Sequence, residues 1–133
     1  MKVVMNIFHR LFYLFSALVL SGHVLAVAPS CSSVQPASSQ SGTTGTIRIY
    51  ANGVANATAV SFPTWGYDDG SQNDLIWYSG TQIGNSGTWY ADVIVDYHNN
   101  ASGSEYGGFA SHVYMSNATD FVYCGGTGWV RPA

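Results

Sequence analysis

Basic side chains are scarce in this sequence of 133 residues, which holds four Lys and Arg against seven Asp and Glu. Beyond residue 28 the chain keeps Arg48, Arg131 and no lysine, while all seven acidic residues remain, so this part has a net charge of −5 with histidine neutral. Nucleic-acid binding requires Lys and Arg that neutralise phosphates, and an anionic membrane surface attracts the same side chains. The sequence therefore excludes nucleic acid as a partner and disfavours an anionic membrane surface.

Long apolar runs are also lacking, with one exception near the start of the chain. Residues 11–20 are mostly apolar, basic residues precede them, and small residues including Ala26 and Ala28 follow, which is the order of a secretory signal peptide. A membrane span needs about 20 apolar residues, so a retained anchor is the weaker alternative. We predict a cleavable signal peptide over residues 1–28, cut after Ala26 in preference to Ala28. The mature chain is then expected to be secreted, periplasmic or on the cell surface, without membrane contact.

Cysteine is limited to Cys31 and Cys124. An even number of cysteines in an exported chain indicates a disulfide, with two separate thiols as the alternative. The bridge would close a loop of about 93 residues, and loop closure of that length stabilises a fold by about 4–5 kcal/mol. We expect the disulfide to hold the N-terminal tail against the last strand.

The texture of the sequence divides the rest of the chain in two. Residues 29–45 hold few large apolar side chains and many Ser, Thr and Gly, as in a linker or tail without a core of its own. Residues 46–133 show short alternating runs between Gly/Asn turns and no helical period, which predicts one all-β domain, an antiparallel β-sandwich of about seven strands. The expected strands are 47–50, 57–62 (ending before Pro63), 74–78, 88–98, 109–115, 120–124 and a further candidate at 128–131.

For two of these strands, the sequence predicts which side chains point toward the core. Alternation over 88–98 predicts one inward set (Trp89, Ala91, Val93, Val95 and Tyr97) and one outward set (Tyr90, Asp92, Ile94, Asp96 and His98). The run 74–78 is apolar on both faces, which predicts a central, doubly covered strand. Trp77 and Trp89 are therefore expected in the core.

The outward set suggests one catalytic hypothesis. Asp92, Asp96 and His98 could serve as general acid and base in a small secreted hydrolase. Along an extended strand, however, the two carboxylates lie about 13–14 Å apart, more than a glycosidase pair. A solvated polar face is the favoured interpretation, and the sequence contains no nucleophile elbow and no phosphate-binding loop. We expect neither enzymatic activity nor a cofactor, with the hydrolase as a remote alternative.

Metal-binding patterns are weak. His98 and His112 are the only histidines beyond the signal peptide, and no His-x-His or Cys-x-x-Cys pair accompanies them, so no transition-metal site is expected. The turn at residues 68–74 is rich in oxygen donors but lacks the EF-hand spacing. Turns prefer these same residue types, so calcium binding there stays open and no metal is assigned.

Aromatic residues carry the remaining functional hypothesis. Trp65, Tyr67 and Tyr106 adjoin turns, and exposed aromatic faces stack on sugar rings, although Trp and Tyr also fill β-sandwich cores. We therefore predict glycan binding through exposed aromatics. The candidate ligand-binding residues are Trp65, Tyr67, Asn73, Asp74, Tyr106, His98 and His112.

Three stretches together, at residues 62–80, 87–100 and 107–115, resemble the GBS Bsp-like repeat. The resemblance rests on a Trp after a Pro, a turn with Gly, a Gln-Asp-Asp-Ile-x-Trp-Tyr-like strand, a Tyr-led strand that ends in His, and a His-Val-Tyr strand. These fall on Pro63, Trp65, Gly70, Gln72, Asn73, Asp74, Leu75, Trp77, Tyr78, Tyr90, His98, His112, Val113 and Tyr114.

The resemblance implies an extracellular, immunoglobulin-like module of the bacterial cell surface with no established catalytic residues. Expected partners are peptidoglycan or another polysaccharide, with an envelope protein as the alternative. The sequence departs from the family pattern in having Asn73 where Asp is usual and in a longer turn before the last stretch. We expect Asn73 and Asp74 to satisfy backbone groups where the turn leads into the strand.

Overall fold

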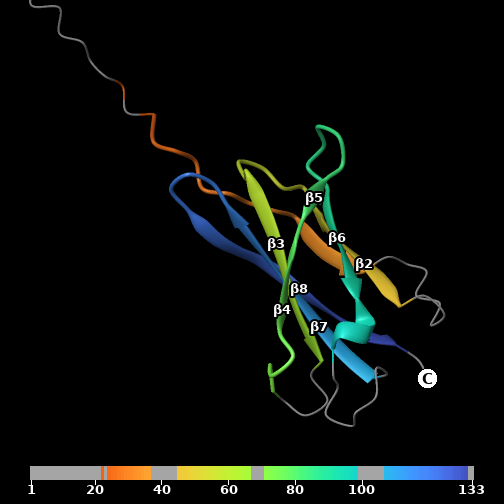
Figure 1. Cartoon of the computed structure of the whole chain (residues 1–133). Helices are drawn as coiled ribbons and strands as arrows, with labels where there is room; N and C mark the ends of the chain where they lie inside the picture. The colour runs from red at the N-terminus through yellow and green to blue at the C-terminus, as the bar shows by residue number, and fades with distance from the viewer. Residues whose placement is uncertain (1–21, 23, 37–44, 67–70, 99–106, 132–133) are drawn as a thin grey trace, which may run out of the picture.

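The computed structural model of the chain describes residues 22, 24–36, 45–66, 71–98 and 107–131. In this part, eight strands form two four-stranded sheets that face each other (Figure 1). Neighbouring strands within each sheet are antiparallel. The prediction of an all-β antiparallel sandwich is confirmed. No helix within these residues is long and apolar enough for a membrane span.

The chain crosses between the two sheets several times. The first has the order β1-β2-β6-β5 and the second the order β4-β3-β7-β8. The strands of the first sheet are β1 (Ser33–Pro36), β2 (Thr46–Asn52), β5 (Thr81–Gln82) and β6 (Trp89–Ile94). Those of the second sheet are β3 (Ala59–Gly66), β4 (Ile76–Ser79), β7 (Gly107–Ser116) and β8 (Phe121–Arg131).

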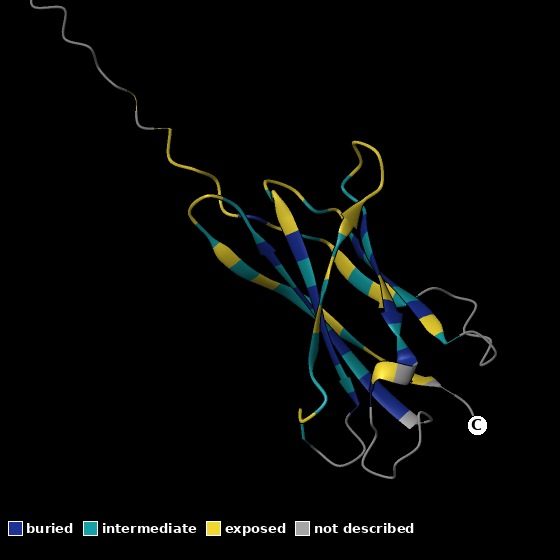
Figure 2. Cartoon of the chain, in the orientation of Figure 1, coloured by how far each residue is buried: buried dark blue, intermediate teal, exposed yellow. Residues whose placement is uncertain are grey.

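The core lies between the sheets, and alternation along the strands supplies it (Figure 2). Successive side chains of a strand point to opposite faces, so every second residue reaches the interior. Phe62 of β3 and Phe109 of β7 are fully buried, and Trp89 is buried as predicted. The full buried set is Ile47, Ile49, Ala51, Val60, Phe62, Trp89, Ala91, Val93, Val95, Phe109, Val113, Met115 and Trp129.

Strand β3 continues through Pro63, whereas the sequence predicted that it would end there. Proline has no N–H to donate, and the β3–β7 register accordingly skips Phe62 and Pro63. The strand survives because β4 pairs with it on the other side, where Pro63 lies opposite Trp77. A proline between two strands is thus tolerated at a gap in one ladder.

A buried chain of hydrogen bonds adjoins this gap. The indole Nε1 of Trp129 donates to Ser111 Oγ at 3.1 Å, and Ser111 Oγ lies 2.8 Å from Thr64 Oγ1. The Thr64 hydroxyl donates in turn to the carbonyl oxygen of Phe62 at 3.3 Å. Since each hydroxyl can donate once and still accept, all three buried polar side chains find a partner.

The prediction that residues 74–78 form a central strand is wrong. β4 is an edge strand, and beyond Gly80 the chain crosses to the other sheet as β5. A Cβ at Gly80 would lie 2.8 Å from both Phe62 Cε2 and the Val60 oxygen, so only glycine fits this crossing. Because no strand covers the outer face of β4, the Trp77 side chain is 52% exposed, and its predicted core position is wrong as well.

The run 88–98 also departs from the predicted alternation. β6 ends at Ile94 and a 3₁₀ turn, η1 (Val95–Tyr97), follows. A 3₁₀ turn has three residues per turn, whereas a strand has a period of two. Beyond Val95, positions predicted to point inward therefore point outward, and the reverse. Tyr97, expected inside, is 65% exposed, and His98, expected outside, is 1% exposed.

The segment 29–45, expected to be a linker or tail without a core of its own, contributes β1 to the first sheet. Just before β1, Ser30 and Ala55 exchange two backbone hydrogen bonds. Asn117 Nδ2 also donates to the carbonyl oxygen of Val27 at 2.9 Å. The described part of the fold therefore begins earlier than residue 46. The predicted signal peptide falls mostly outside the described residues and stays a prediction.

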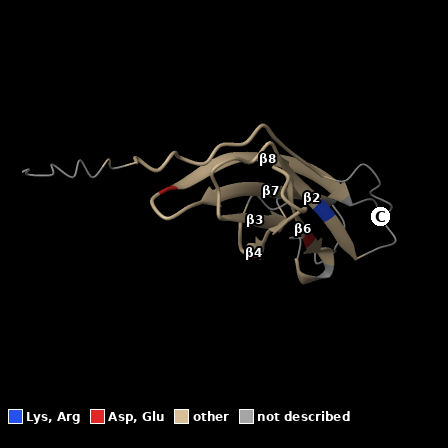
Figure 3. Ribbon diagram, turned by 90° about the horizontal axis from the view of Figure 1, so that it is seen from above, with Lys and Arg blue, Asp and Glu red and all other residues tan. Residues whose placement is uncertain are grey.

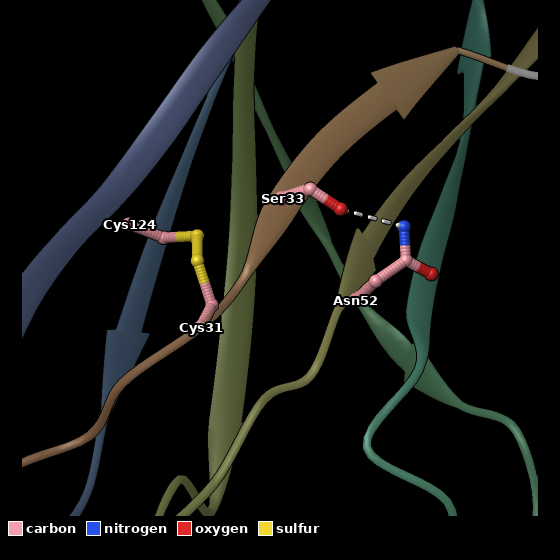
Figure 4. The surroundings of a disulfide bond; sticks show 4 residues. All are labelled: Cys31, Ser33, Asn52 and Cys124. Carbon is pink, nitrogen blue, oxygen red and sulfur yellow. Dashed lines mark hydrogen bonds between the residues drawn. A yellow bond between two sulfur atoms is a disulfide. The ribbon is translucent and has the colours of Figure 1, made fainter.

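The Cys31–Cys124 disulfide joins the start of β1 to β8, as predicted (Figure 4). The two Cα atoms are 5.7 Å apart, and Asn52 Nδ2 donates to Ser33 Oγ beside the bridge. β1 has only four residues and pairs only with β2. The covalent bond therefore fixes this short edge strand to the opposite sheet.

We predict that removal of the bridge lowers the free energy of unfolding by about 3–5 kcal/mol, because a closed loop of this length restricts the unfolded chain. The variant is the double replacement Cys31→Ser with Cys124→Ser, compared with the oxidised and the reduced wild-type chain in urea unfolding. Reduced wild type should match the double variant. Equal midpoints for the oxidised and the reduced chain would contradict the prediction.

Candidate functional site

The outer surface of the second sheet carries six aromatic rings, which we call the aromatic face. They occupy outward positions on all four strands of the sheet. Three of them are at least half exposed, with 52% for Trp77, 64% for Phe121 and 50% for Tyr123. The aromatic face consists of Trp65, Trp77, His112, Tyr114, Phe121 and Tyr123.

Strand period and register together build this face. On β7 and β8 the rings are spaced two residues apart, so each pair points to the same side. The register then places Tyr114 directly opposite Tyr123, across neighbouring strands. Pro63, opposite Trp77, is buried although the strand period gives it an outward position. The edge position of β4 leaves Trp77 open to solvent.

The rings form two diagonal rows of three. In the first row, Tyr114 lies between Trp77 and Phe121, with ring centroids 5.5 and 5.1 Å away. In the second, His112 lies between Trp65 and Tyr123, with centroids 4.8 and 5.1 Å away. Tyr114 and Tyr123 link the rows at 5.3 Å. Aromatic pairs at such separations attract one another by about 0.5–1.5 kcal/mol, so the rings hold one another in place.

Gly126 lies under the second row. A Cβ there would come within 2.6 Å of His112 Cδ2 and 3.2 Å of the Tyr123 hydroxyl oxygen. At Gly128, two residues further along β8, a Cβ would meet nothing closer than 3.8 Å. The position of the His112 ring therefore depends on the missing side chain of Gly126 and not on that of Gly128.

Charge is almost absent from the sheet that carries the aromatic face. β3, β4 and β7 contain no Asp, Glu, Lys or Arg, and β8 contains Arg131 alone, at its end. In Figure 3, β3, β4 and β7 are tan, without the blue or red of charged residues. Arg48 and Asp92 lie on the other sheet, on β2 and β6, and pair through two hydrogen bonds of 2.7 and 2.9 Å. The Arg48 guanidinium also stacks over the Tyr90 ring at 3.8 Å. The aromatic face is thus an uncharged surface.

A second cluster of functional groups is buried at the end of β4. His98 Nδ1 lies 3.1 Å from the backbone oxygen of Asp74, and Nε2 lies 2.8 Å from the Tyr78 hydroxyl. Because a carbonyl only accepts, Nδ1 carries the proton and Nε2 accepts from Tyr78. Burial raises the pKa of Tyr78 to about 12 and lowers the pKa of His98. The neutral imidazole thus holds the turn, the edge strand and the end of η1 together.

Asp74 has the structural role that the sequence predicted for it. Both carboxylate oxygens accept from the backbone N–H of Gly66, at 3.1 and 3.2 Å. One of them also lies 3.8 Å from His98 Nδ1. The carboxylate therefore satisfies a backbone group where the turn leads into β4. Asn73 is exposed beside it.

Apart from Asn73, which is exposed in the turn, the predicted ligand-binding residues fall into three groups. Trp65 and His112 meet on the aromatic face. Asp74 and His98 meet in the buried cluster, where His98 is closed to solvent. Tyr67 and Tyr106 lie outside the described residues.

Two members of the catalytic set proposed from the sequence, Asp92 and His98, do not come together. Asp92 is exposed and paired with Arg48, while His98 is buried, so the two do not share a face. The Asp96 side chain lies outside the described residues. Among the residues that are described, no three His, Cys, Asp or Glu gather as metal ligands. Part of the oxygen-rich turn, residues 68–70, is likewise outside them.

Sequence reasoning missed four of the six rings on the aromatic face. Trp77 was assigned to the core because both faces of its strand are apolar. Tyr114, Phe121 and Tyr123 were not singled out, although the i, i+2 spacing in His112/Tyr114 and in Phe121/Tyr123 places each pair on one face. Only the pairing of β7 with β8 shows that the two faces are continuous.

Comparison with known proteins gives one result. The model of the GBS Bsp-like repeat family matches residues 37–126, which starts earlier than the domain boundary predicted at residue 46. No curated protein and no solved structure matches the chain.

The buried imidazole predicts a loss of stability in mild acid. The unfolded chain takes up a proton near pH 6.5, while folded His98 resists protonation because its pKa is lowered. Stability is therefore complete above about pH 6.5 and falls as the pH drops below it, by up to about 1.4 kcal/mol per pH unit. Urea unfolding between pH 7.5 and 5 would measure this, with His98→Gln as the variant that lacks the titration. An equal slope in both proteins would refute the assignment.

Proposed function

Because the chain belongs to the GBS Bsp-like repeat family, we propose that it acts as a non-catalytic extracellular module that binds cell-wall or other glycans through the aromatic face. The family is one of extracellular repeat modules rather than enzymes. A single observation supports the glycan role. Six aromatic rings cluster on an uncharged sheet face, and three of them are at least 50% exposed.

An extracellular location is supported by two further features. The Cys31–Cys124 disulfide suits an oxidising compartment outside the cytoplasm. The first 28 residues have the order of a signal peptide. Secretion brings the module to the polysaccharides of the envelope or the cell surface.

The chemistry of the rings favours sugar as the ligand. The face of an aromatic ring carries negative charge in its quadrupole and attracts the weakly positive C–H groups that line one side of a sugar ring. Tyr114 and Tyr123 add hydroxyl groups that can exchange hydrogen bonds with sugar hydroxyls. The face therefore offers both contacts that a carbohydrate needs, without a charge.

A role without catalysis is supported by what the described polar groups do. Asp92 is engaged by Arg48, Asp74 by a backbone N–H, and His98 by Tyr78 and the Asp74 carbonyl. These three groups therefore hold the fold together, and none of them belongs to the aromatic face.

The second candidate function is docking of an envelope protein, which the same exposed apolar surface favours. Large exposed apolar patches on a soluble domain commonly mark protein interfaces. A protein partner would also use Trp77 and Phe121, so replacement of these residues does not by itself separate the two functions. Retention on a purified polymer, without any protein present, does separate them.

We predict that residues 29–133, with the disulfide formed, are retained on purified insoluble peptidoglycan or another polysaccharide in a pull-down. Trp77→Ala should weaken retention about tenfold, or about 1.4 kcal/mol, because Trp is enriched among the few residues that carry most of the binding energy of a surface. Tyr97→Ala is the matched control, since Tyr97 is 65% exposed but lies in η1, away from the aromatic face.

Thermal unfolding of each variant shows that the fold is intact before retention is compared. Loss of retention in Trp77→Ala alone supports the glycan role. No retention of the wild-type chain on any polymer would reject that role and leave protein docking as the better proposal.

A further inference from the structure

We propose that the ligand of the aromatic face is an uncharged polysaccharide strand that is engaged over several sugar rings, and that acidic polymers are rejected. This inference rests on the proposed glycan-binding function and narrows its ligand class. It follows from the charge around the face, from the length of the ring rows and from the way the rings are held.

The charge around the aromatic face is unfavourable to an anion. Arg131, eight residues beyond Tyr123 at the end of β8, is the one basic residue in the strands of this sheet, and its side chain lies outside the described residues. Arg48 is on the other sheet and is already paired with Asp92. The nearest charge in sequence to the first row is the carboxylate of Asp120, which directly precedes Phe121. The chain beyond the signal peptide also has a net charge of −5, which repels a polyanion within about 10 Å at ordinary salt. A neutral polysaccharide is not subject to this electrostatic repulsion.

The length of the rows sets the minimum size of the ligand. Each row has three rings with successive centroids about 5 Å apart, so the outer rings are separated by a middle ring. A sugar ring is similar in size to one of these side-chain rings. A single sugar therefore covers one member of a row, whereas an oligosaccharide can contact both ends of it.

The rings are already fixed in the free protein. Five ring contacts link the six side chains, and Gly126 leaves room for the His112 ring against the sheet. Binding therefore costs little side-chain entropy. Fixed rings also favour a regular partner, and a polysaccharide presents the same sugar face at each repeat.

The experiment tests charge and length separately, with insoluble chitin and cellulose as neutral probes and alginate beads as the anionic probe. We expect retention on at least one neutral polymer, equal retention in 1 M NaCl, and none on alginate. The bound protein is then released with the matching sugars, N-acetylglucosamine for chitin or glucose for cellulose, as the monomer and as the six-unit oligomer. The oligomer should act at a concentration at least tenfold lower than that of the monomer.

A matched pair of glycine variants tests the ring geometry without the removal of any aromatic residue. Gly126→Ala forces the His112 ring to move, and should weaken retention about threefold or more, the equivalent of one aromatic contact. Gly128→Ala lies on the same strand and meets only an ordinary contact, so its retention should equal that of the wild type. Thermal unfolding confirms that both variants fold.

The outcomes distinguish this inference from the function on which it rests. Retention on alginate, release by salt, or a monomer as effective as the oligomer would overturn the inference and leave glycan binding in place. Binding to peptidoglycan but to neither chitin nor cellulose would do the same. Failure to bind any polymer would overturn both, and a dimer in solution that Trp77→Ala dissociates would assign the face to a second copy of the chain.

Discussion

A β-bulge interrupts the pairing of β7 with β8, and the aromatic face, the disulfide and part of the core all depend on it. Val113 lies opposite Gly125 and Tyr114 opposite Tyr123, so Cys124 is an extra residue in β8. A bulge of this kind changes which residues of a strand point inward. Before it, Phe121 and Tyr123 point to solvent; beyond it, Trp129 points into the core. Cys124 itself turns toward Cys31. One inserted residue thus allows β8 to place rings on the aromatic face, a cysteine at the disulfide and Trp129 in the core.

The buried polar residues form hydrogen bonds with one another and with the backbone, and the aromatic face takes no part in these bonds. Thr64, Ser111 and Trp129 satisfy one another inside the sandwich, and Asp74, Tyr78 and His98 close its end around the β4 turn. The polar side chains that the sequence suggested as reactive, Asp74 and His98, are therefore engaged in hydrogen bonds that stabilise the fold. The residues quoted for the family resemblance divide accordingly. Tyr78 and His98 belong to the buried cluster, whereas Trp65 and Trp77 belong to the surface.

Much of the fold follows from local patterns in the sequence. Alternation identified β2 and most of β6, turn residues separated the strands, and two cysteines in an exported chain indicated the bridge. The errors share one cause, which is that period alone does not show what lies beside a strand. Trp77 has apolar neighbours on both sides in sequence, yet β4 is an edge strand. Tyr97 and His98 continue the alternating pattern in sequence, yet η1 interrupts it in space.

The sequence by itself determined the β-sandwich class, the disulfide and the lack of basic charge, because period, cysteine number and composition are properties of single segments. Only the tertiary structure decided that Trp77, Tyr114, Phe121 and Tyr123 share one surface with Trp65 and His112. That surface joins strands that are up to about 60 residues apart in the chain. Which strand lies at an edge, and where a bulge shifts the register, depends on long-range pairing energies that no single segment contains.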